Sequence, residues 1–205
     1  MTSPAVNAPL SDAALDQLFR DARSRNRWTD KPVPESMIRA IYDLLKMGPT
    51  ASNQCPGRYV WVHSAEAKER LKPHLSPNNV VKVMTAPWVV IIAHDLNFPA
   101  TLPKLFPHNK DAPNWFKDPA VAAESAFRNG TLEAAYLMLA ARSLGLDCGP
   151  MGGFSNAGVD QEFFLNDPAR ASWRSNFLCC VGYGSDEALF PRLPRLSFEE
   201  ASQIL

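Results

Sequence analysis

Three short apolar runs, at residues 59–63, 88–94 and 177–183, constrain the fold of this 205-residue chain more than any other feature. Each run is rich in β-branched and aromatic residues and has the length of a buried strand. In a doubly wound sheet, predicted strands and helices alternate regularly along the chain, and here they do not. The nucleotide-binding motif GxGxxG does not follow any of the three runs either. The spacing therefore predicts an α+β fold in which helices pack around a few central strands.

Apolar residues recur at helical spacing in several segments around these runs. The predicted helices span residues 11–25, 34–48, 65–75 and 119–145, with a short one after Ser197. Ser11 and Asp118 are residue types preferred at helix N-caps, and Gly145 suits a C-cap. We expect Phe19 and Leu44 to lie on the buried faces of the first two helices.

Residues 96–118 break this pattern, because they carry several prolines and aromatic residues without a clear period. A loop of this length in a compact domain is usually functional or disordered. Phe106, Trp115 and Phe116 argue against disorder, since large apolar side chains are depleted in disordered segments. We expect an ordered lid or a partner-facing excursion that also contains His108. No linker or repeat divides the chain, so residues 1–205 are predicted to form one domain.

The charge of the chain is balanced, with 21 basic and 21 acidic residues, so no overall field draws it to nucleic acid or to an anionic membrane. The longest apolar run, residues 86–93, is far shorter than the roughly 20 residues that cross a bilayer. The first residues lack the basic start and apolar core of a secretory signal, and the cysteines and histidines lack metal-ligand spacing. We expect a cytoplasmic protein with no membrane span, no nucleic-acid partner and no metal.

A cluster of basic residues lies at the end of the first predicted helix: Arg20, Arg23, Arg25 and Arg27. With Ser24 beside them, these guanidinium groups suit a phosphate, through charge-assisted and bidentate hydrogen bonds. A solvated basic helix end, where cations also favour the helix dipole, is an alternative. An arm that binds nucleic acid is a third alternative, but the cluster lacks interleaved aromatic residues beyond Trp28 and the net charge of the chain gives it no support.

Three later segments carry more glycine, proline or polar residues than a plain turn needs. They are GPTASNQCPGRYVWV after the second helix, GLDCGPMGGF after the long helix, and GYGSDEALFPRLPRLSFEEA, which holds Arg192 and Arg195 between prolines. Glycines permit a flat ligand to approach the backbone closely, and prolines stiffen a loop that presents guanidinium groups. Taken singly, each segment is also consistent with an ordinary surface loop, a helix C-cap or ordinary surface arginines.

Taken in order, the segments ARSRNRWTDKPVP, GPTASNQCPGRYV, GLDCGPMGGF and RLPRLSFEEA resemble the FMN-dependent nitroreductase family over most of the chain. The helix FRNGTLEAAYLMLAARSLGLD and the spacing of the last two segments are most similar to the malonic semialdehyde reductase branch, associated with pyrimidine degradation. The resemblance implies a nitroreductase-like fold with a central, mostly antiparallel sheet flanked by helices. It also implies an intertwined homodimer with two FMN sites at the interface, each built from both subunits.

The resemblance further implies which residues bind FMN. The phosphate contacts match Arg23, Ser24, Arg25, Arg27, Arg192 and Arg195. The loop that lies against the flavin held by the other subunit matches Pro49, Thr50, Ser52 and Asn53. The edge of the flavin ring would be contacted by Asn79 and Lys82, and the segment whose backbone N–H points at flavin N5 matches Pro150, Gly152 and Gly153. Asn26, Cys55 and Gly57 depart from the usual residues of these motifs, which bears on substrate preference.

On this resemblance the chain would be an NAD(P)H-dependent oxidoreductase that transfers hydride through flavin N5 in a ping-pong reaction, with no catalytic nucleophile. NADH or NADPH would be the co-substrate, and malonic semialdehyde, reduced to 3-hydroxypropionate, the acceptor. The carboxylate of that acceptor requires a cation, for which Arg128 is a candidate, although a helix-surface salt bridge is the alternative role of this residue. Phe106 and Trp115 would close over the flavin and select the acceptor. A broad nitroaromatic or quinone reductase and a non-catalytic flavin-binding protein remain as alternatives.

Overall fold

Strand β2 (Trp88–Asp95), which is buried along its whole length, lies in the interior of a four-stranded antiparallel sheet. The computed structural model describes residues 8–205. The sheet has the order β1-β2-β4-β3, and its other strands are β1 (Gly57–Val62), β3 (Asp147–Met151) and β4 (Trp173–Gly182). The α+β fold and the mostly antiparallel sheet expected from the sequence are confirmed.

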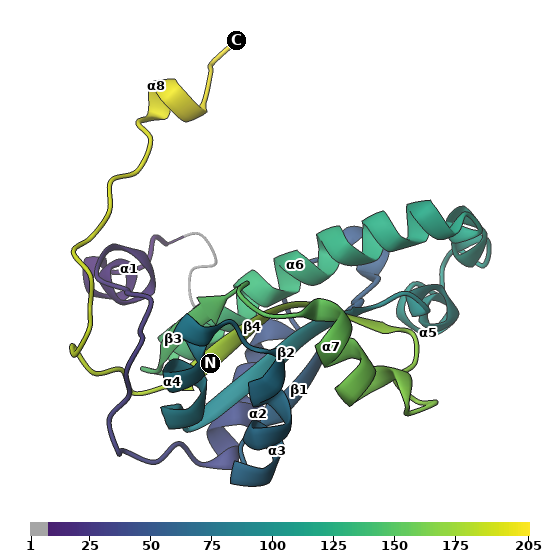
Figure 1. Ribbon diagram of the computed structural model, residues 1–205. Helices are drawn as coiled ribbons and strands as arrows, with labels where there is room; N and C mark the ends of the chain where they lie inside the picture. The colour runs from purple at the N-terminus through teal and green to yellow at the C-terminus, as the bar shows by residue number, and fades with distance from the viewer. Residues whose placement is uncertain (1–7) are drawn as a thin grey trace.

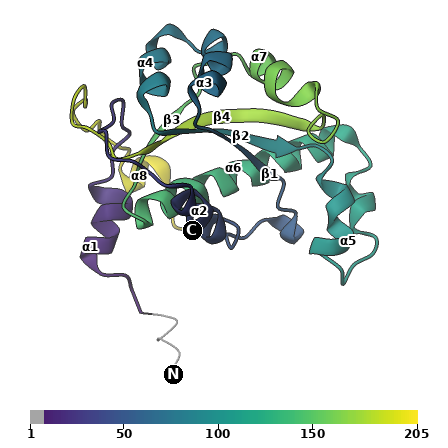
Figure 2. The same cartoon turned by 90° about the horizontal axis from the view of Figure 1, so that it is seen from below.

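Helices cover both faces of this sheet. They are α1 (Asp12–Leu15), α2 (Glu35–Leu45), α3 (Ala65–Leu71), α4 (Pro77–Thr85), α5 (Leu102–Leu105), α6 (Pro119–Ser143), α7 (Asn156–Asp160) and α8 (Phe198–Ala201). One π-helical turn extends α1 over Asp16–Arg20 and another extends α7 over Gln161–Leu165. Figure 2 shows α2 and α6 on one face of the sheet and α3, α4 and α7 on the other.

The two sheet faces bury separate apolar cores. Val90 and Ile92 point toward α2 and α6, whereas Val89 and Ile91 point toward the opposite helices. This alternation follows from the two-residue period of a strand and requires β2 to be apolar on both sides. The adjacent Cys179 and Cys180 divide between the two cores in the same way, and all four cysteines are free thiols.

The long helix α6 forms the main support of the sheet. The Asp118 side chain accepts a hydrogen bond from the Ala120 N–H at 2.8 Å and caps its start. Gly145, with φ of +78°, ends it in the left-handed conformation that glycine adopts without strain. Small buried residues such as Ala126 and Ala134 let the helix approach its neighbours closely. The predicted caps of this helix are therefore confirmed.

The first helix is shorter than predicted, because it ends at Arg20 rather than Arg25. The following segment leaves the helical path and runs beside β3, where Ser24 bridges Cys148 and the Arg25 N–H donates to the Cys148 carbonyl at 3.0 Å. The prediction that Phe19 and Leu44 are buried is also wrong, since 55% of Phe19 and 48% of Leu44 is exposed. Both side chains face away from the core of this chain.

The first predicted central strand, β1, lies at the edge of the sheet instead. It pairs with β2 on one side, and no described strand of this chain pairs with its other side. Strand β3 and helices α4 and α7 were not predicted. Their sequences contain glycine, proline or polar residues that favour turns over regular structure.

Residues 96–118 fold as a compact excursion with its own small core. A 3-10 turn (Phe98–Thr101), α5 and a second 3-10 turn (Ala112–Phe116) bury Phe98, Leu102 and Ala112 against the start of α6. Figure 1 shows this excursion and α1 at opposite ends of the molecule. The excursion is ordered, as its aromatic residues predicted.

The C-terminal segment, residues 183–205, leaves β4, passes α1 and continues away from the body of the molecule (Figure 1). It ends near α8, where Ser197 and Glu200 form both hydrogen bonds of a capping box, as predicted. Within residues 8–205, no helix is long and apolar enough to cross a membrane. The same residues contain no cluster of histidine, cysteine and acidic side chains that could hold a metal ion.

Candidate functional site

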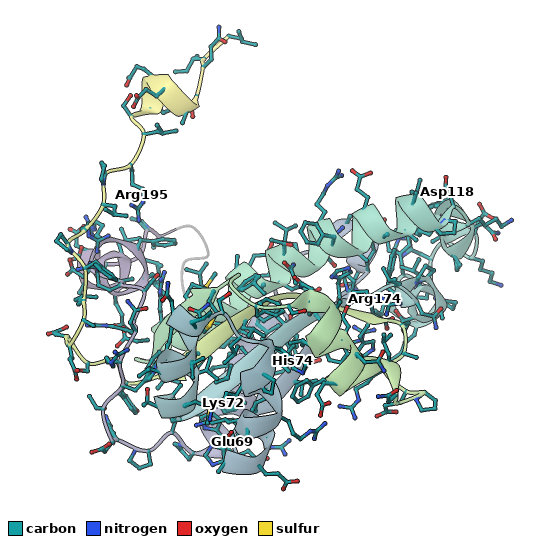
Figure 3. All side chains as sticks on the ribbon, in the orientation of Figure 1. Glu69, Lys72, His74, Asp118, Arg174 and Arg195 are labelled. Carbon is teal, nitrogen blue, oxygen red and sulfur yellow. The ribbon has the colours of Figure 1, made fainter. Side chains whose placement is uncertain are left out.

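A cleft of about 540 Å³ lies between the end of the first helix and the C-terminal segment. Its walls bring together residues from three distant parts of the sequence: Phe19, Ala22, Arg23, Ser24, Asn26, Arg142, Leu189, Phe190, Pro191, Arg192, Leu193 and Arg195. The structure thus places four predicted phosphate contacts, Arg23, Ser24, Arg192 and Arg195, around one cavity. Figure 3 shows Arg195 beside α1 at this end of the molecule.

Four arginines line this cleft without an acidic partner: Arg23, Arg142, Arg192 and Arg195. Among the described residues, none of them has a carboxylate oxygen within 4.0 Å, although such pairs form on nearby arginines. Arg20, which follows the cleft residue Phe19 but does not line the cleft, contacts both Asp12 and Asp16. We call these four residues the arginine cluster. No carboxylate among residues 8–205 pairs with the cluster, and such a concentration of positive charge favours an anion.

The arginine cluster is held in place by backbone carbonyl groups. Arg23 donates to the carbonyl of Phe190, Arg192 donates to that of Ala22 at 3.1 Å, and Arg142 donates to that of Leu18 at 2.9 Å. These bonds tie the C-terminal segment and the first helix to each other and to α6. Each guanidinium has five N–H groups, so donors remain for an anion in the cleft.

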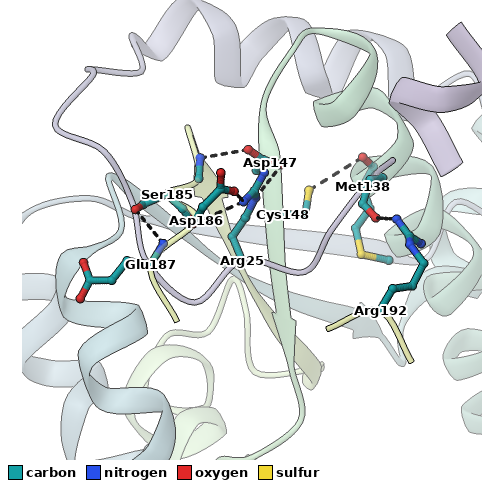
Figure 4. A network of polar contacts seen from close by, with 10 residues as sticks. Arg25, Met138, Asp147, Cys148, Ser185, Asp186, Glu187 and Arg192 are labelled. Carbon is teal, nitrogen blue, oxygen red and sulfur yellow. Dashed lines mark hydrogen bonds and ion pairs between the residues drawn. The ribbon is translucent and has the colours of Figure 1, made fainter. Parts of the chain in front are cut away.

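Arg25 and Arg27, which the sequence also suggested as phosphate contacts, have acidic partners. Figure 4 shows Arg25 between Asp147 and Asp186; its Nε lies 3.4 Å from Asp147, and its Nη1 donates to the Asp186 carboxylate. Arg27 Nε lies 3.9 Å from Glu187. Neither residue lines the cleft. The structure therefore uses Arg25 to join the N-terminal segment to the ends of β3 and β4.

Next to the cleft, α4 lies against β3 and the turn that follows it. Lys82 Nζ donates to the Pro150 carbonyl at 3.2 Å, and the Asn79 side chain donates to the Gly153 carbonyl at 2.9 Å. Burial of Lys82 lowers its pKa. The structure thus brings both predicted α4 residues to the glycine segment, as the order of the motifs suggested.

The three glycines of GLDCGPMGGF that follow Gly145 differ in what surrounds them. A Cβ at Gly149 would lie 2.5 Å from the Arg25 carbonyl oxygen, and one at Gly153 would lie 2.7 Å from Asn79 Nδ2. A Cβ at Gly152 would meet no atom within 4 Å. Gly149 is therefore required for packing against the backbone of Arg25, and a Cβ at Gly153 would displace the Asn79 side chain, whereas Gly152 presents open backbone.

The loop from Pro49 to Pro56 lies at the other end of the sheet. The loop ends next to Gly57, which pairs with His94 near the C-terminal end of β2. The cleft lies near Cys148, which pairs with Val181. Val181 in turn pairs with Trp88, the first residue of β2. At about 3.3 Å per residue, the six steps from Trp88 to His94 separate the two regions by roughly 20 Å. Within one chain, Thr50, Ser52 and Asn53 therefore do not meet the arginine cluster.

The excursion contacts this same loop. The Asn53 side chain donates to the Leu105 carbonyl at 2.8 Å, and Phe106 lies 3.8 Å from His108 and 6.1 Å from Trp115, measured between ring centres.

Arg128 forms an ion pair with Glu124 on the exposed side of α6, as the alternative interpretation of Arg128 held. Figure 3 places Arg174 and Asp118 toward this end, far from Arg195.

Sequence reasoning missed the buried polar residues of α6 that face the loop, Asn129 and Glu133, and it missed Arg142. Burial raises the pKa of Glu133, which accepts the Gly57 N–H at 2.7 Å. The available signal was a pair of polar residues four apart on a face otherwise made of alanine and leucine. Arg142 gave no such signal, because a basic residue in the last turn of a helix is common.

Comparison with known proteins shows which family this chain matches. Residues 19–183 match the model of the nitroreductase family. A Caulobacter sp. (strain K31) protein, provisionally named an NADH dehydrogenase/NAD(P)H nitroreductase, is 54% identical over 198 residues, which cover 97% of this chain and all of that protein.

Solved structures share the fold at lower identity. A Bacillus subtilis structure, provisionally named a nitroreductase, superposes with a TM-score of 0.83 at 23% identity, covering 94% of this chain and 99% of that one. An Exiguobacterium sibiricum protein, also provisionally named a nitroreductase and solved in complex with FMN, has a TM-score of 0.82 at 19% identity, with 97% and 99% coverage.

Proposed function

This chain belongs to the nitroreductase family and is an NAD(P)H-dependent flavin oxidoreductase, and we propose that its arginine cluster binds the phosphate of FMN. The observation that carries the proposal is the convergence on one cleft of four arginines that have no carboxylate partner among residues 8–205. A phosphate dianion is the natural counter-charge for such a cluster, and bidentate geometry favours arginine over lysine for this role. Ser24 adds a neutral donor on the same wall.

The flavin ring would extend from the phosphate along β3 toward Gly152. The open space at the Gly152 Cβ position and the close packing at Gly149 and Gly153 fit a flat group lying against this turn. Lys82 would place its ammonium group beside the ring. Burial lowers the pKa of this group, and a negative charge on the ring would favour its protonated form. Gly152 would supply a backbone N–H toward flavin N5.

FMN, when bound, supplies the centre that accepts hydride from NAD(P)H and passes it to the acceptor. The protein would orient the ring, keep one ring face against the β3 turn and present the other face to NAD(P)H and then to the acceptor. Hydride transfer of this kind needs no side-chain nucleophile. The ping-pong order follows because both substrates would use the same open face.

A second copy of the chain would complete each site. The loop from Pro49 to Pro56 lies roughly 20 Å from the cleft in its own chain, which supports assigning its flavin contacts to the site of a partner chain. Large apolar side chains stay exposed on one chain, including Phe19, Met47 and Phe127, and an apolar groove of about 370 Å³ lies between α2 and α6. Exposed surface of this kind indicates a protein interface.

The C-terminal segment and the edge of β1 fit the same homodimer. Clefts of about 530 and 310 Å³ flank β1 on its two faces, and both include Trp61. Residues 198–205 project from the body of the molecule with Ile204 and Leu205 exposed. An extended segment of the partner would pair with the free edge of β1 and place alternate side chains in the two clefts.

For the acceptor we favour a small aldehyde such as malonic semialdehyde, on the resemblance of the long helix to that branch. A broad nitroaromatic or quinone reductase is the second candidate. The ion pair of Arg128 with Glu124 favours this second candidate, because Arg128 is then less available to bind the carboxylate of the aldehyde. The rates with malonic semialdehyde, nitroaromatic compounds and quinones as acceptors should therefore be compared at the same concentration of NADH or NADPH.

The test of the proposed function is a visible spectrum of the purified protein after FMN is added and the excess removed. A retained flavin spectrum that bleaches under anaerobic NADH or NADPH is the expected result. A protein that retains FMN but does not bleach would instead be a flavin-binding protein without turnover. A colourless protein would refute the proposed site, and an Arg195→Gln variant that binds FMN as tightly as the wild type would refute the role of the arginine cluster.

A further inference from the structure

The loop that would face the partner's flavin has an unusual backbone. Ser52, Asn53 and Cys55 have φ values of 50°, 49° and 42°, in the left-handed region that favours glycine. Such residues persist only where the surrounding structure holds them, and they gather at functional sites. The question is what holds this loop.

A stripe of polar residues on α6 provides the contacts. Ser125, Asn129, Glu133 and Tyr136 follow each other at intervals of four, four and three residues, so they lie along one side of the helix. In most of α6 the buried side is lined by alanine and leucine. We call these four residues the polar stripe.

Each member of the polar stripe bonds to a different point of the loop. Asn129 accepts the Ala51 N–H at 2.8 Å, and Glu133 accepts the Gly57 N–H at 2.7 Å. These two bonds bracket the strained residues on both sides. The loop backbone is therefore attached to α6 before and after its left-handed turn.

The remaining bonds of the polar stripe close the network. Ser125 donates to Gln54 Oε1 at 2.9 Å, and Tyr136 donates to the Pro49 carbonyl at 3.0 Å. Gln54, the loop residue that points inward, is only 2% exposed, and Asn129 and Glu133 are 3% and 5% exposed. Since buried polar groups are costly unless they are paired, these residues are retained for the bonds they make.

The surroundings of Glu133 make it the most sensitive member of the stripe. Arg58, Cys55 and Tyr59 are the ionisable groups that face it, and the Tyr59 hydroxyl is buried without a hydrogen-bond partner. Burial raises the pKa of Glu133, because the ionised form loses its water shell. A neutral acceptor at this position would still hold the Gly57 N–H.

We infer that Asn129 and Glu133 are positioning residues, which hold the loop from Pro49 to Pro56 in the conformation that contacts the partner's flavin. The inference rests on the proposed function, because it assigns the strained loop to the FMN site. The two side chains touch neither flavin nor acceptor; they act through the backbone N–H groups of Ala51 and Gly57. The strained loop is thereby ready before FMN or substrate binds.

The test compares variants that remove an acceptor with variants that keep it. Asn129→Leu and Glu133→Leu remove the bond to the loop, whereas Asn129→Asp and Glu133→Gln retain an oxygen in the same place. Glu69→Leu, at an exposed carboxylate of α3, is the matched control. Measurements are the FMN dissociation constant, kcat and KM for the acceptor, and hydrogen exchange of the peptide covering residues 49–57.

We expect the two leucine variants to lose about 10- to 100-fold in kcat/KM, the effect of a small displacement of a positioned group. The same variants should show faster exchange in the loop but unchanged exchange in β2. Glu133→Gln should recover most of the activity and the protection. Asn129→Asp should recover only part of them, because its carboxylate still accepts the Ala51 N–H but loses the bonds that Asn129 donates to Ser125 and Gln54. If Glu133→Leu does not fold, the two Asn129 variants make the same comparison.

Two results would overturn the inference. One is an active wild-type flavoenzyme whose leucine variants keep the FMN affinity, kcat/KM and loop protection of the wild type. The other is equal damage in the leucine variants and in the variants that keep the acceptor. A wild-type protein that does not bind FMN would refute the proposed function instead, and the exchange measurement on the FMN-free protein would still decide whether α6 holds the loop.

Discussion

Replacing Gly152 with alanine should separate FMN binding from the stability of the chain. The new Cβ would meet no atom within 4 Å, and Gly152 does not have a positive φ. The unfolded chain loses conformational entropy when glycine becomes alanine, so the free energy of unfolding without FMN should stay equal or rise by up to about 1 kcal/mol. Gly153→Ala is the matched comparison, because its Cβ would lie 2.7 Å from Asn79 Nδ2 and should cost about 1–3 kcal/mol.

The two variants should behave differently once FMN is added. At a ligand concentration of 100 Kd, the wild type gains about 2.7 kcal/mol, which for a domain of this size raises the melting temperature by about 5–11 °C. A methyl group at Gly152 would occupy the place assigned to the flavin ring. If affinity falls about 100-fold, the gain at the same FMN concentration drops to about 0.4 kcal/mol.

The assay is thermal unfolding with and without FMN, at fixed protein concentration because the oligomeric state affects the melting temperature. Gly152→Ala should melt like the wild type without FMN and should show almost no shift with it. A full wild-type shift in Gly152→Ala would refute the placement of the ring against this turn. Loss of stability in the absence of FMN would refute the reading of Gly152 as open backbone.

Three further predictions follow from the arginine cluster, the C-terminal segment and the polar stripe. Arg195→Gln should weaken FMN binding about 10- to 100-fold, the effect of losing a charge-assisted hydrogen bond, whereas Arg20→Gln, which removes a residue already paired with acids, should leave the FMN titration unchanged. A chain truncated before residue 190 should sediment as a monomer, and a dimer of wild-type stability would refute the contribution of this segment. Burial raises the pKa of Glu133 in the folded protein, so the folded state keeps its proton to a higher pH than the unfolded state does. The free energy of unfolding should therefore fall as the pH rises from about 4.5 through the raised pKa. Urea unfolding across this pH range should show the fall in the wild type and not in Glu133→Gln.

The strands that the sequence predicted correctly are those whose composition is decisive by itself. Residues 88–94 must be apolar on both sides because β2 is covered by helices on both faces, and few other structures require such a run. Strand β3 has the sequence DCGPM, in which glycine and proline disfavour a strand. It is extended because it pairs with β4 and because Gly149 lets Arg25 and Lys82 approach, and these contacts come from distant parts of the chain.

In the candidate site, too, some residues could be predicted from the local sequence and others depend on contacts with distant parts of the chain. Arg192 and Arg195 could be predicted because arginines between prolines in a late loop are unusual, and the structure places them beside Arg23 and Ser24. Arg25 carries the same charge as the neighbouring arginines, and only the fold shows that it forms ion pairs with Asp147 and Asp186. Burial of α1 side chains was overestimated because helical spacing identifies an apolar face without saying whether the chain itself or a partner covers it.

The roughly 20 Å between the two ends of β2 has a genetic consequence. If each site joins the arginine cluster of one chain to the loop of another, a chain damaged only at Arg195 and a chain damaged only at Asn129 can pair. One site of the mixed dimer then carries both defects, and the other carries neither. Two inactive alleles expressed together should restore about a quarter of wild-type activity when chains pair at random, since about half of the dimers are mixed and each has one intact site. Two damaged alleles of the same kind should restore none.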